Sequence, residues 1–195
     1  MDRERLKGLL KNELGYLPAG NAIDLLIDLG TPVRYDRGDV IIGVGQNMPD
    51  IFIVNSGIVR FVDMNGDRER TFGFALAGTV FMSKHSFVMD LPSYYQVEAC
   101  CESEMLVIKR EAFRKAINES KELALWMLDY AYGELFYQEH KNKAIHNGTA
   151  AERYKSIYDD RPEILEKVPQ KIIASYLGVT PEYLSKLKRD SLKRR

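Results

Sequence analysis

The alternation of hydrophobic and polar positions divides the chain into a β-rich middle and helical ends. From Thr31 to about Ile108, short runs rich in Val, Ile, Phe and Tyr alternate with glycines. This pattern is typical of a sandwich or barrel of short strands. Asn65-Gly66 predicts a tight hairpin, because both central residues of a type I′ turn need positive φ. The expected strand runs are VIIGVG (40–45), IFIVNSGIVRFVD (51–63), RERTFGFAL (68–76), YYQVEACC (94–101) and MLVIK (105–109).

Helical patterns follow the predicted strands. Residues 111–118 form a short one, and residues 120–146 form a long one that carries a heptad seam. Two polar positions of this seam, Gln138 and Asn142, are unusual in a monomer core but common where a helix pairs with itself, so the seam predicts a homodimer. The seam consists of Ala124, Leu128, Ala131, Leu135, Gln138, Asn142 and Ile145.

A second apolar stripe lies beside the seam and consists of Leu125, Tyr132 and Phe136. One face of the long helix can therefore pack on the β-rich region while the seam packs on a second copy of the chain. The alternative is a single amphipathic helix that is buried against its own domain.

Four short helices are expected between residues 149 and 190. Asn147-Gly148 ends the long helix, and Thr149 with Glu152 three residues later has the spacing of a capping box. Three prolines then mark helix starts, since proline suits the first helical position. They stand in Arg161-Pro162, Val168-Pro169 and Thr180-Pro181.

The last two of these helices have the spacing of a helix-turn-helix. Ala174 follows Gln170 by four residues, where a larger side chain would push the helices apart, and Gly178 follows by eight, at the turn. Val179 can fill the corner. The small shared core is Ile173, Leu177, Leu184 and Leu187, and the outward residues of the second helix are Thr180, Glu182, Tyr183, Ser185, Lys186 and Arg189. An ordinary αα-hairpin is the alternative, but it does not require a basic, polar outer face.

Charge supports an anionic partner for this end of the chain. The net formal charge is 0, but seven basic and two acidic residues from Gln170 onward give +5, which leaves −5 on residues 1–169. A basic region on an acidic body is typical of nucleic-acid binding, although a solvated terminal helix has the same composition.

The basic and polar side chains of this region differ in which part of the DNA they can contact. Lys186 and Arg189 can reach base edges or phosphates, and Glu182 can accept from a cytosine amino group. Ser185 and Thr180 can bond to either, and Tyr183 can touch a thymine methyl group or a phosphate, or pack against the hinge. Phosphate contacts, which supply affinity but no sequence information, are expected from Lys171, Lys188, Lys193, Arg194 and Arg195.

Other classes of protein are poorly supported. The adjacent Cys100 and Cys101 lack metal-site spacing and are expected to pack in or beside a strand. The three histidines, His85, His140 and His146, are scattered, so we expect no metal, no haem and no enzyme of the cupin type. The start, MDRERLKGLLKNELGY, reads as an amphipathic helix and not as a signal peptide, and no apolar run approaches membrane-spanning length, which favours the cytoplasm.

In the order of its parts the chain resembles the Crp/Fnr-type bacterial transcription regulators. The segment YDRGDVIIGVGQNMPDIFIVNSGIVRFV is similar to the first half of a cyclic-nucleotide-binding β-roll, and PQKIIASYLGVTPEYLSKLKRD is similar to the short regulators of this family found in Bacteroidetes-type bacteria. The resemblance implies an α+β fold: a jelly-roll-like, double-stranded β-roll sensor domain (1–119), a dimerisation helix (120–147) and a small all-α helix-turn-helix domain without a C-terminal wing (148–195).

The resemblance also implies a function. Members of the family bind double-stranded DNA as homodimers on near-palindromic sites, and RNA polymerase is a further candidate partner. Pro181 stands where the members that respond to cyclic AMP carry a guanine-reading arginine, so the target sequence is expected to differ from theirs. The alternative function is a small-ligand sensor that acts through protein interaction and not through DNA.

The residues that hold cyclic AMP in the family are missing. Met82-Ser83 falls where a Gly-Glu pair should hold the ribose, and Ser93-Tyr94 where Arg-Ser should hold the phosphate. The long helix has no Ser or Thr between Lys121 and Gly148 to read adenine. We therefore expect no cyclic AMP binding in the usual mode and leave the effector open. Lys84 and His85 are candidate anion contacts or part of a solvated loop, and the candidate pocket is Ser83, Lys84, His85, Ser93 and Tyr94.

Overall fold

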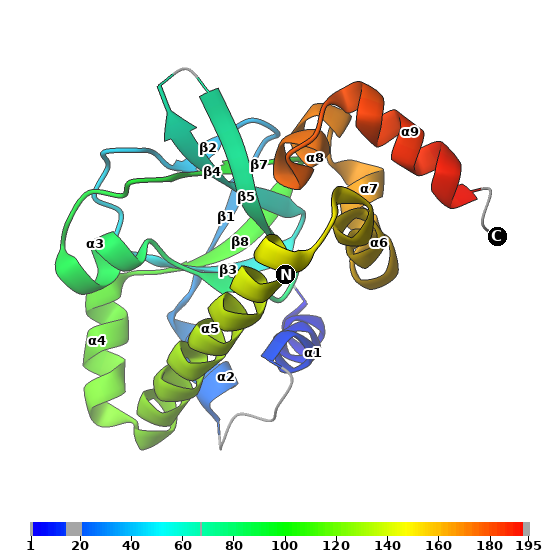
Figure 1. Cartoon of the computed structure of the whole chain (residues 1–195). Coiled ribbons are helices and arrows are strands. Elements are labelled where there is room, and N and C mark those ends of the chain that lie inside the picture. The colour runs from blue at the N-terminus through cyan, green and yellow to red at the C-terminus, as the bar shows by residue number, and fades with distance from the viewer. Residues whose placement is uncertain (1, 15–20, 67, 193–195) are drawn as a thin grey trace.

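The fold is a β-sandwich with helices on both of its outer sides (Figure 1). The computed structural model describes residues 2–14, 21–66 and 68–192. One four-stranded sheet has the order β1-β8-β3-β6 and the other has the order β2-β7-β4-β5, with antiparallel pairing throughout. The strands are β1 (Thr31–Tyr35), β2 (Val40–Ile42), β3 (Ile51–Ser56), β4 (Ile58–Asn65), β5 (Arg68–Leu76), β6 (Val80–Phe81), β7 (Gln96–Ala99) and β8 (Ser103–Ile108).

The helices are grouped at the two ends of the sequence and around one short segment between β6 and β7. In chain order, two helices precede the first strand, α3 lies between β6 and β7, and the remaining helices follow the last strand. They are α1 (Arg3–Leu14), α2 (Ala22–Leu29), α3 (Lys84–Met89), α4 (Arg110–Glu119), α5 (Lys121–Asn147), α6 (Ala150–Asp160), α7 (Pro162–Lys167), α8 (Gln170–Leu177) and α9 (Pro181–Leu192).

Three apolar clusters account for the layers. The middle cluster fills the space between the sheets and includes Phe52, Val59 and Met105. A second cluster joins the outer face of the β1-β8-β3-β6 sheet to α1, α2, α4 and α5, with Trp126 at its centre. A third joins the outer face of the other sheet to α6–α9. Because both faces of β3 are covered, its first five residues are all buried, which explains why this strand reads as an unbroken apolar run.

The expected jelly-roll-like α+β fold is confirmed, with small differences in detail. The run 51–63 is not one strand, because Gly57 at φ +89° separates β3 from β4. A side chain at this position would also collide with the backbone of Ser103, so only glycine fits. The hairpin at Asn65-Gly66 is present, but Asn65 pairs with Arg68, so Asn65 belongs to the strand and Gly66 begins the turn.

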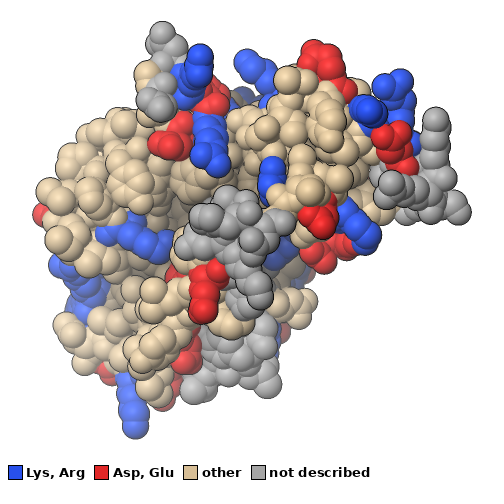
Figure 2. Space-filling model, viewed as in Figure 1, with Lys and Arg blue, Asp and Glu red and all other residues tan. Residues whose placement is uncertain are grey.

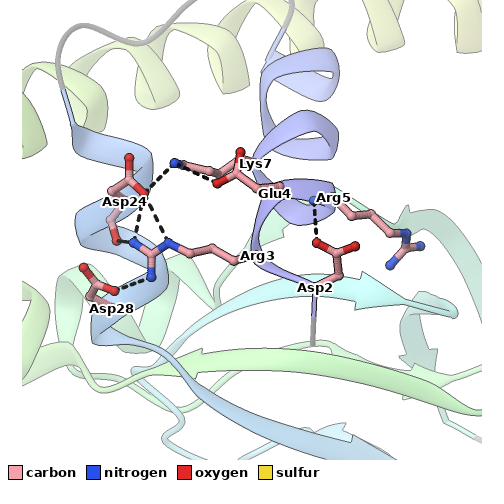
Figure 3. Close-up of polar contacts among 7 residues, drawn as sticks. All are labelled: Asp2, Arg3, Glu4, Arg5, Lys7, Asp24 and Asp28. Carbon is pink, nitrogen blue, oxygen red and sulfur yellow. Dashed lines mark hydrogen bonds and ion pairs between the residues drawn. The ribbon is translucent and has the colours of Figure 1, made fainter.

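The first helix is fastened to the second by charged side chains (Figure 3). Asp24 of α2 accepts hydrogen bonds from Arg3 at 2.9 Å and forms an ion pair with Lys7 at 2.8 Å. Arg3 also reaches Asp28. Hydrogen bonds from Lys7 and then from Arg3 lower the pKa of Asp24, and the hydrogen bond from Arg3 lowers the pKa of Asp28. The apolar side of α1, Leu6 and Leu10, is fully buried beneath this cluster.

Acid should loosen the attachment of α1. Because the pKa of Asp24 and of Asp28 is lower in the folded chain than the ordinary 3.8, their contribution to stability is present above pH 3.8 and is lost as the pH falls through the folded values. We expect Asp24→Asn to flatten the dependence of the urea midpoint on pH between about pH 5 and pH 2. Asp63→Asn, an exposed change in β4, is the control. An unchanged pH dependence in Asp24→Asn would contradict the assignment.

Candidate functional site

The turn between α8 and α9 depends on Gly178. This residue has φ +67° and ψ 36°, and its backbone N–H donates to the carbonyls of Ala174 and Ser175. The N–H of Val179 donates to the same Ala174 carbonyl at 3.0 Å. This pattern satisfies the last carbonyls of α8 and reverses the chain within two residues. The expected helix-turn-helix geometry is therefore present, with Ile173, Ala174, Leu177 and Leu184 buried and Val179 and Leu187 half-buried.

Thr180 starts α9. Its hydroxyl accepts a hydrogen bond from the N–H of Tyr183 at 3.3 Å, and its carbonyl accepts from the N–H of Leu184. Hydrogen bonds from its own backbone N–H and then from the Thr180 hydroxyl lower the pKa of Glu182. Glu182 is therefore a carboxylate at neutral pH and lies in the first turn, where the helix dipole favours negative charge.

The outer face of α9 is exposed, as its sequence predicts. Lys186 and Arg189 are both exposed, and so are Thr180, Glu182 and Tyr183. Ser185 is exposed too, but its hydroxyl donates to the carbonyl of Pro181 at 3.0 Å, so in this state it is used within its own helix. Lys171 is exposed at the start of α8. Three further predicted contacts, Lys193, Arg194 and Arg195, lie outside the described residues.

The helix α9 projects from the body of the molecule. In Figure 1 it runs outward from α8 to the C-terminus, and Figure 2 shows basic side chains at this end of the molecule. Basic and acidic side chains are mixed there, because Glu182 and Asp190 share the helix with Lys186, Lys188 and Arg189.

Arg153 in α6 is a positioning residue that the sequence pattern did not single out. Its guanidinium donates to the carbonyl of Gly148 at 2.6 Å and to the carbonyl of Leu177 at 2.8 Å. Gly148 follows the long helix and Leu177 is the last residue of α8. One side chain therefore ties the end of α5 to the helix-turn-helix. The only signal in the sequence is a cation near helix C-termini, which is too common to be specific.

The helix-turn-helix is docked on β5, which the sequence did not predict. The hydroxyl of Ser175 in α8 accepts from the backbone N–H of Thr71 at 3.0 Å, and the rings of Tyr176 and Phe74 lie 5.1 Å apart. The apolar part of this interface belongs to the third cluster, in which Ile58 and Leu76 meet the core of α6–α9. The neighbouring Cys100 is buried at the end of β7, in agreement with its expected place beside a strand.

The face of the long helix α5 that packs on its own domain is not the face that was expected. Leu123, Trp126 and Tyr130 are the buried residues that pack it on the β-sandwich. The second stripe, which includes Leu125 and Tyr132, does not pack there and is exposed.

The dimer seam is also exposed on α5. Leu128 is 48% exposed and Leu135 is 67% exposed, and both Ala131 and Gln138 are exposed as well. The side chain of Asn142 lies outside the described residues. One face of α5 packs on its own domain and the described seam residues are exposed. The dimer seam and the alternative of one amphipathic helix buried against its own domain therefore both stay predictions.

The predicted pocket residues lie around α3, but most of them are engaged with their neighbours. Ser83 is fully buried and caps α3, since its hydroxyl accepts from the N–H of Ser86. Ser93 is buried and donates to the carbonyl of Tyr95 at 2.8 Å. Lys84 forms an ion pair with Glu134 of α5 at 2.6 Å. Ser83, Lys84 and Ser93 therefore each have a protein partner, and their role in a ligand site stays a prediction.

The remaining two pocket residues are at the surface. His85 contacts the carbonyl of Pro92 at 3.0 Å through Nδ1, and its ring lies 5.2 Å from the ring of Tyr94. Tyr94 is exposed. His85 lies in α3 and is half-buried, so the interpretation of a solvated loop does not hold for it.

A cavity of about 810 Å³ lies beside these residues, between the β-sandwich, α5 and the C-terminal helices. Its inner end is lined by aromatic rings of the sandwich, among them Phe72 and Tyr95, whose centroids are 5.6 Å apart. Tyr130 of α5 lines it from the opposite side, and Tyr176 lines it from α8. Lys84 and Tyr94 of the predicted pocket also line this cavity. Its other aromatic residues were not predicted, because they are spread over five separate elements.

Comparison with known proteins shows similarity to one domain family and to a bacterial regulator. Residues 32–120 match the sequence profile of the cyclic nucleotide-binding domain. Over 173 residues the chain is 28% identical to the nitrogen fixation regulation protein FixK of Azorhizobium caulinodans, which covers 81% of this chain and 67% of that protein. The chain is thus similar to a bacterial regulator over most of its length.

Solved structures agree with this relationship. The structure of FixK2 from Bradyrhizobium japonicum matches with a TM-score of 0.71 and 22% identity over 85% of each chain. The catabolite activator protein of Thermus thermophilus matches with a TM-score of 0.57 and 18% identity, over 93% of this chain and 87% of that chain. The shared fold extends beyond the cyclic nucleotide-binding domain and includes the long helix and the C-terminal helices.

No described helix combines the length and the apolar composition needed to cross a bilayer. Within the same residues, His, Cys, Asp and Glu side chains form no group of three or more that could hold a metal ion.

A side chain at position 178 should disturb the helix-turn-helix by its backbone conformation alone. No atom lies near the place of an added Cβ, so strain at φ +67° is the main cost of a substitution. We expect Gly178→Val to lower the free energy of unfolding by about 1–2 kcal/mol, and Gly178→Asn to cost less, because Asn tolerates the left-handed region. Urea unfolding of both variants measures the difference. Equal effects of Val and Asn would contradict a conformational cause.

Proposed function

We propose that the protein is a transcription regulator of the Crp/Fnr type that inserts α9 into the DNA major groove. The observation that carries the proposal is the two-sided character of α9. Its inner side is anchored by the fully buried Leu184, whereas Glu182, Lys186 and Arg189 are exposed on a helix that projects from the molecule. An ordinary αα-hairpin has no need for this face, and a helix-turn-helix presents such a face to base edges.

The proposed division of the chain follows its elements. Residues 1–119 act as the sensor domain, 120–147 as the dimerisation helix and 148–195 as the DNA-binding domain. Double-stranded DNA and a second copy of the chain are the proposed partners, and RNA polymerase is a candidate partner of the complex on DNA. The protein would act in the cytoplasm, where its DNA is.

A homodimer through α5 would place two copies of α9 on one face of the DNA. The exposed seam residues Leu128 and Leu135 lie beside a second exposed group, Leu125, Tyr132 and Phe136. A continuous exposed apolar surface of this kind marks an interaction site on most proteins. A two-fold symmetric dimer reads two half-sites about one helical turn, roughly 34 Å, apart, which accounts for a near-palindromic target.

We further propose that cyclic AMP is not the effector in the usual binding mode. A buried phosphate needs a guanidinium or several backbone donors. At the two positions where the family holds ribose and phosphate, the buried hydroxyls of Ser83 and Ser93 are hydrogen-bonded to neighbouring protein groups. Neither position carries a charge that could balance a cyclic phosphate.

Lys186 should determine sequence preference. A base-edge contact is worth about 1–3 kcal/mol of discrimination, whereas loss of a phosphate contact weakens all sequences alike. We expect Lys186→Ala to relax the preference at one base pair of each half-site. The measurement is selection of bound duplexes from a random pool, followed by binding to the selected and to scrambled duplexes over a salt series.

Lys171→Ala is the matched control for Lys186→Ala, because Lys171 is an exposed lysine at the start of α8. It should lower affinity for all duplexes and reduce the salt slope by about one unit, without changing preference. If the wild type shows no affinity that falls with salt, DNA binding is ruled out, and the alternative of a sensor that acts through protein interaction is supported.

Charges in the seam should separate the dimer. Each aspartate in Leu128→Asp/Leu135→Asp would be buried without a partner at the interface, at a cost of several kcal/mol. We expect this variant to be a monomer by light scattering at micromolar concentration, with a far-UV circular dichroism spectrum like that of the wild type. Met89→Asp/Leu91→Asp, which changes two exposed apolar residues far from the seam, should remain a dimer. A monomeric wild type would contradict the proposal.

A further inference from the structure

The cavity beside α5 extends from the sensor domain into the DNA-binding domain. At its inner end it is lined by Phe81 and Tyr95, which are buried in the β-sandwich, and at its outer end by Ile157, Ile164 and Tyr176 of the C-terminal helices. Its volume, about 810 Å³, lies in the usual range for small-molecule sites. The buried inner end is enclosed by side chains of separate elements, so a small molecule fits it better than a protein segment does.

Several polar groups along this cavity are already paired. The hydroxyl of Tyr95 donates to the carbonyl of Met82 at 3.0 Å, and the hydroxyl of Tyr130 donates to the carbonyl of Val80 at 3.3 Å. Lys84 at the side of the cavity is paired with Glu134. A charged ligand that used these groups would break an existing pair, whereas a neutral ligand would leave each of these bonds intact.

The same cavity offers many aromatic surfaces. Phe61 lies edge-on to Phe81 at 5.5 Å and near Tyr95 at 6.1 Å, and Phe72 lies edge-on to Tyr95 at 5.6 Å. Rings arranged at right angles to one another present both faces and edges, which suits an aromatic guest. Asp160 and Arg161, which have opposite charges, line the cavity from the C-terminal helices.

We propose that this cavity binds a neutral, ring-containing, apolar small molecule, and that this molecule is the effector of the protein. The binding site is inferred from the cavity alone, whereas its role as an effector site rests on the proposed function as a regulator. Such a ligand contacts the sandwich, α5 and α6–α8 at the same time. A ligand that binds one arrangement of these parts better than another shifts the population toward it, and so changes the position of α9.

The test uses two dyes with the same rings. N-phenyl-1-naphthylamine is neutral, and 8-anilino-1-naphthalenesulfonate carries a sulfonate on the same scaffold. We expect the neutral dye to bind the full-length protein saturably, with one site per chain, and at least roughly tenfold more tightly than the anionic dye, because an unpaired buried charge is costly. Fluorescence titration gives both affinities.

A cavity-filling variant localises the dye. Met127 lines the cavity from α5 and is half-buried, so Met127→Trp should reduce affinity for the neutral dye at least roughly tenfold by filling the space. Met89→Trp is the matched control, since Met89 is exposed on α3 and does not line the cavity. It should bind the dye like the wild type. Circular dichroism and light scattering confirm that both variants keep the wild-type fold and oligomeric state.

Three results would overturn the proposal. They are absence of saturable binding of the neutral dye, tighter binding of the sulfonated dye, and equal dye affinity in Met127→Trp and the wild type. Competition by cyclic AMP would also overturn the assigned ligand class. The effector role requires in addition that the neutral dye changes the affinity for a selected duplex in the wild type but not in Met127→Trp. Failure of DNA binding without dye would count against the proposed function alone.

Discussion

The architecture depends on burial of the outer face of the β2-β7-β4-β5 sheet by the C-terminal helices. A two-sheet sandwich needs only its inner faces covered, and the outer face of an antiparallel sheet is commonly solvated. Here Ile58, Leu76 and Cys100 on that outer face share one apolar cluster with the helix-turn-helix core. The helix-turn-helix unit therefore lies on this sheet and is more than a tail attached by α5.

Docking on the sheet also explains an unusual buried charge. Arg60 of β4 is only 6% exposed and makes two hydrogen bonds to Glu98, at 2.8 and 3.2 Å, and one to Glu69 at 3.0 Å. Burial acts to lower the pKa of Arg60, but the bonds to Glu98 and Glu69 outweigh it and raise the pKa. A buried charge of this kind is tolerated only when its hydrogen bonds are satisfied, and three oxygens meet that condition here.

Local features of the chain were predictable, and long-range ones were not. The turn at Gly178, the capping box at Thr149 and the short strands follow from residue types at fixed spacings, and the structure has them. The face of α5 that packs on the sandwich was missed. Its apolar residues surround much of the helix, so periodicity could not decide between the faces that carry Trp126 and Tyr132.

The pocket was predicted only in part, for a related reason. The resemblance to the family directs attention to the ribose and phosphate positions, here Ser83 and Ser93, whose hydroxyls make local hydrogen bonds. Of the predicted pocket residues, Lys84 and Tyr94 line the cavity. The space that is present is created by packing between β5, α5 and α8, which no local pattern contains.

The contact between the two units is well suited to adjustment. It combines an apolar cluster of moderate size with the single hydrogen bond from Thr71 to Ser175 and the ring contact of Phe74 with Tyr176. Interfaces between domains of one chain are commonly small and polar enough to permit relative motion. Phe74 and Tyr176 also line the cavity, so a molecule bound there would touch the contact itself. A ligand in this position needs no long pathway to alter the orientation of α9, because it shares side chains with the interface that fixes this orientation.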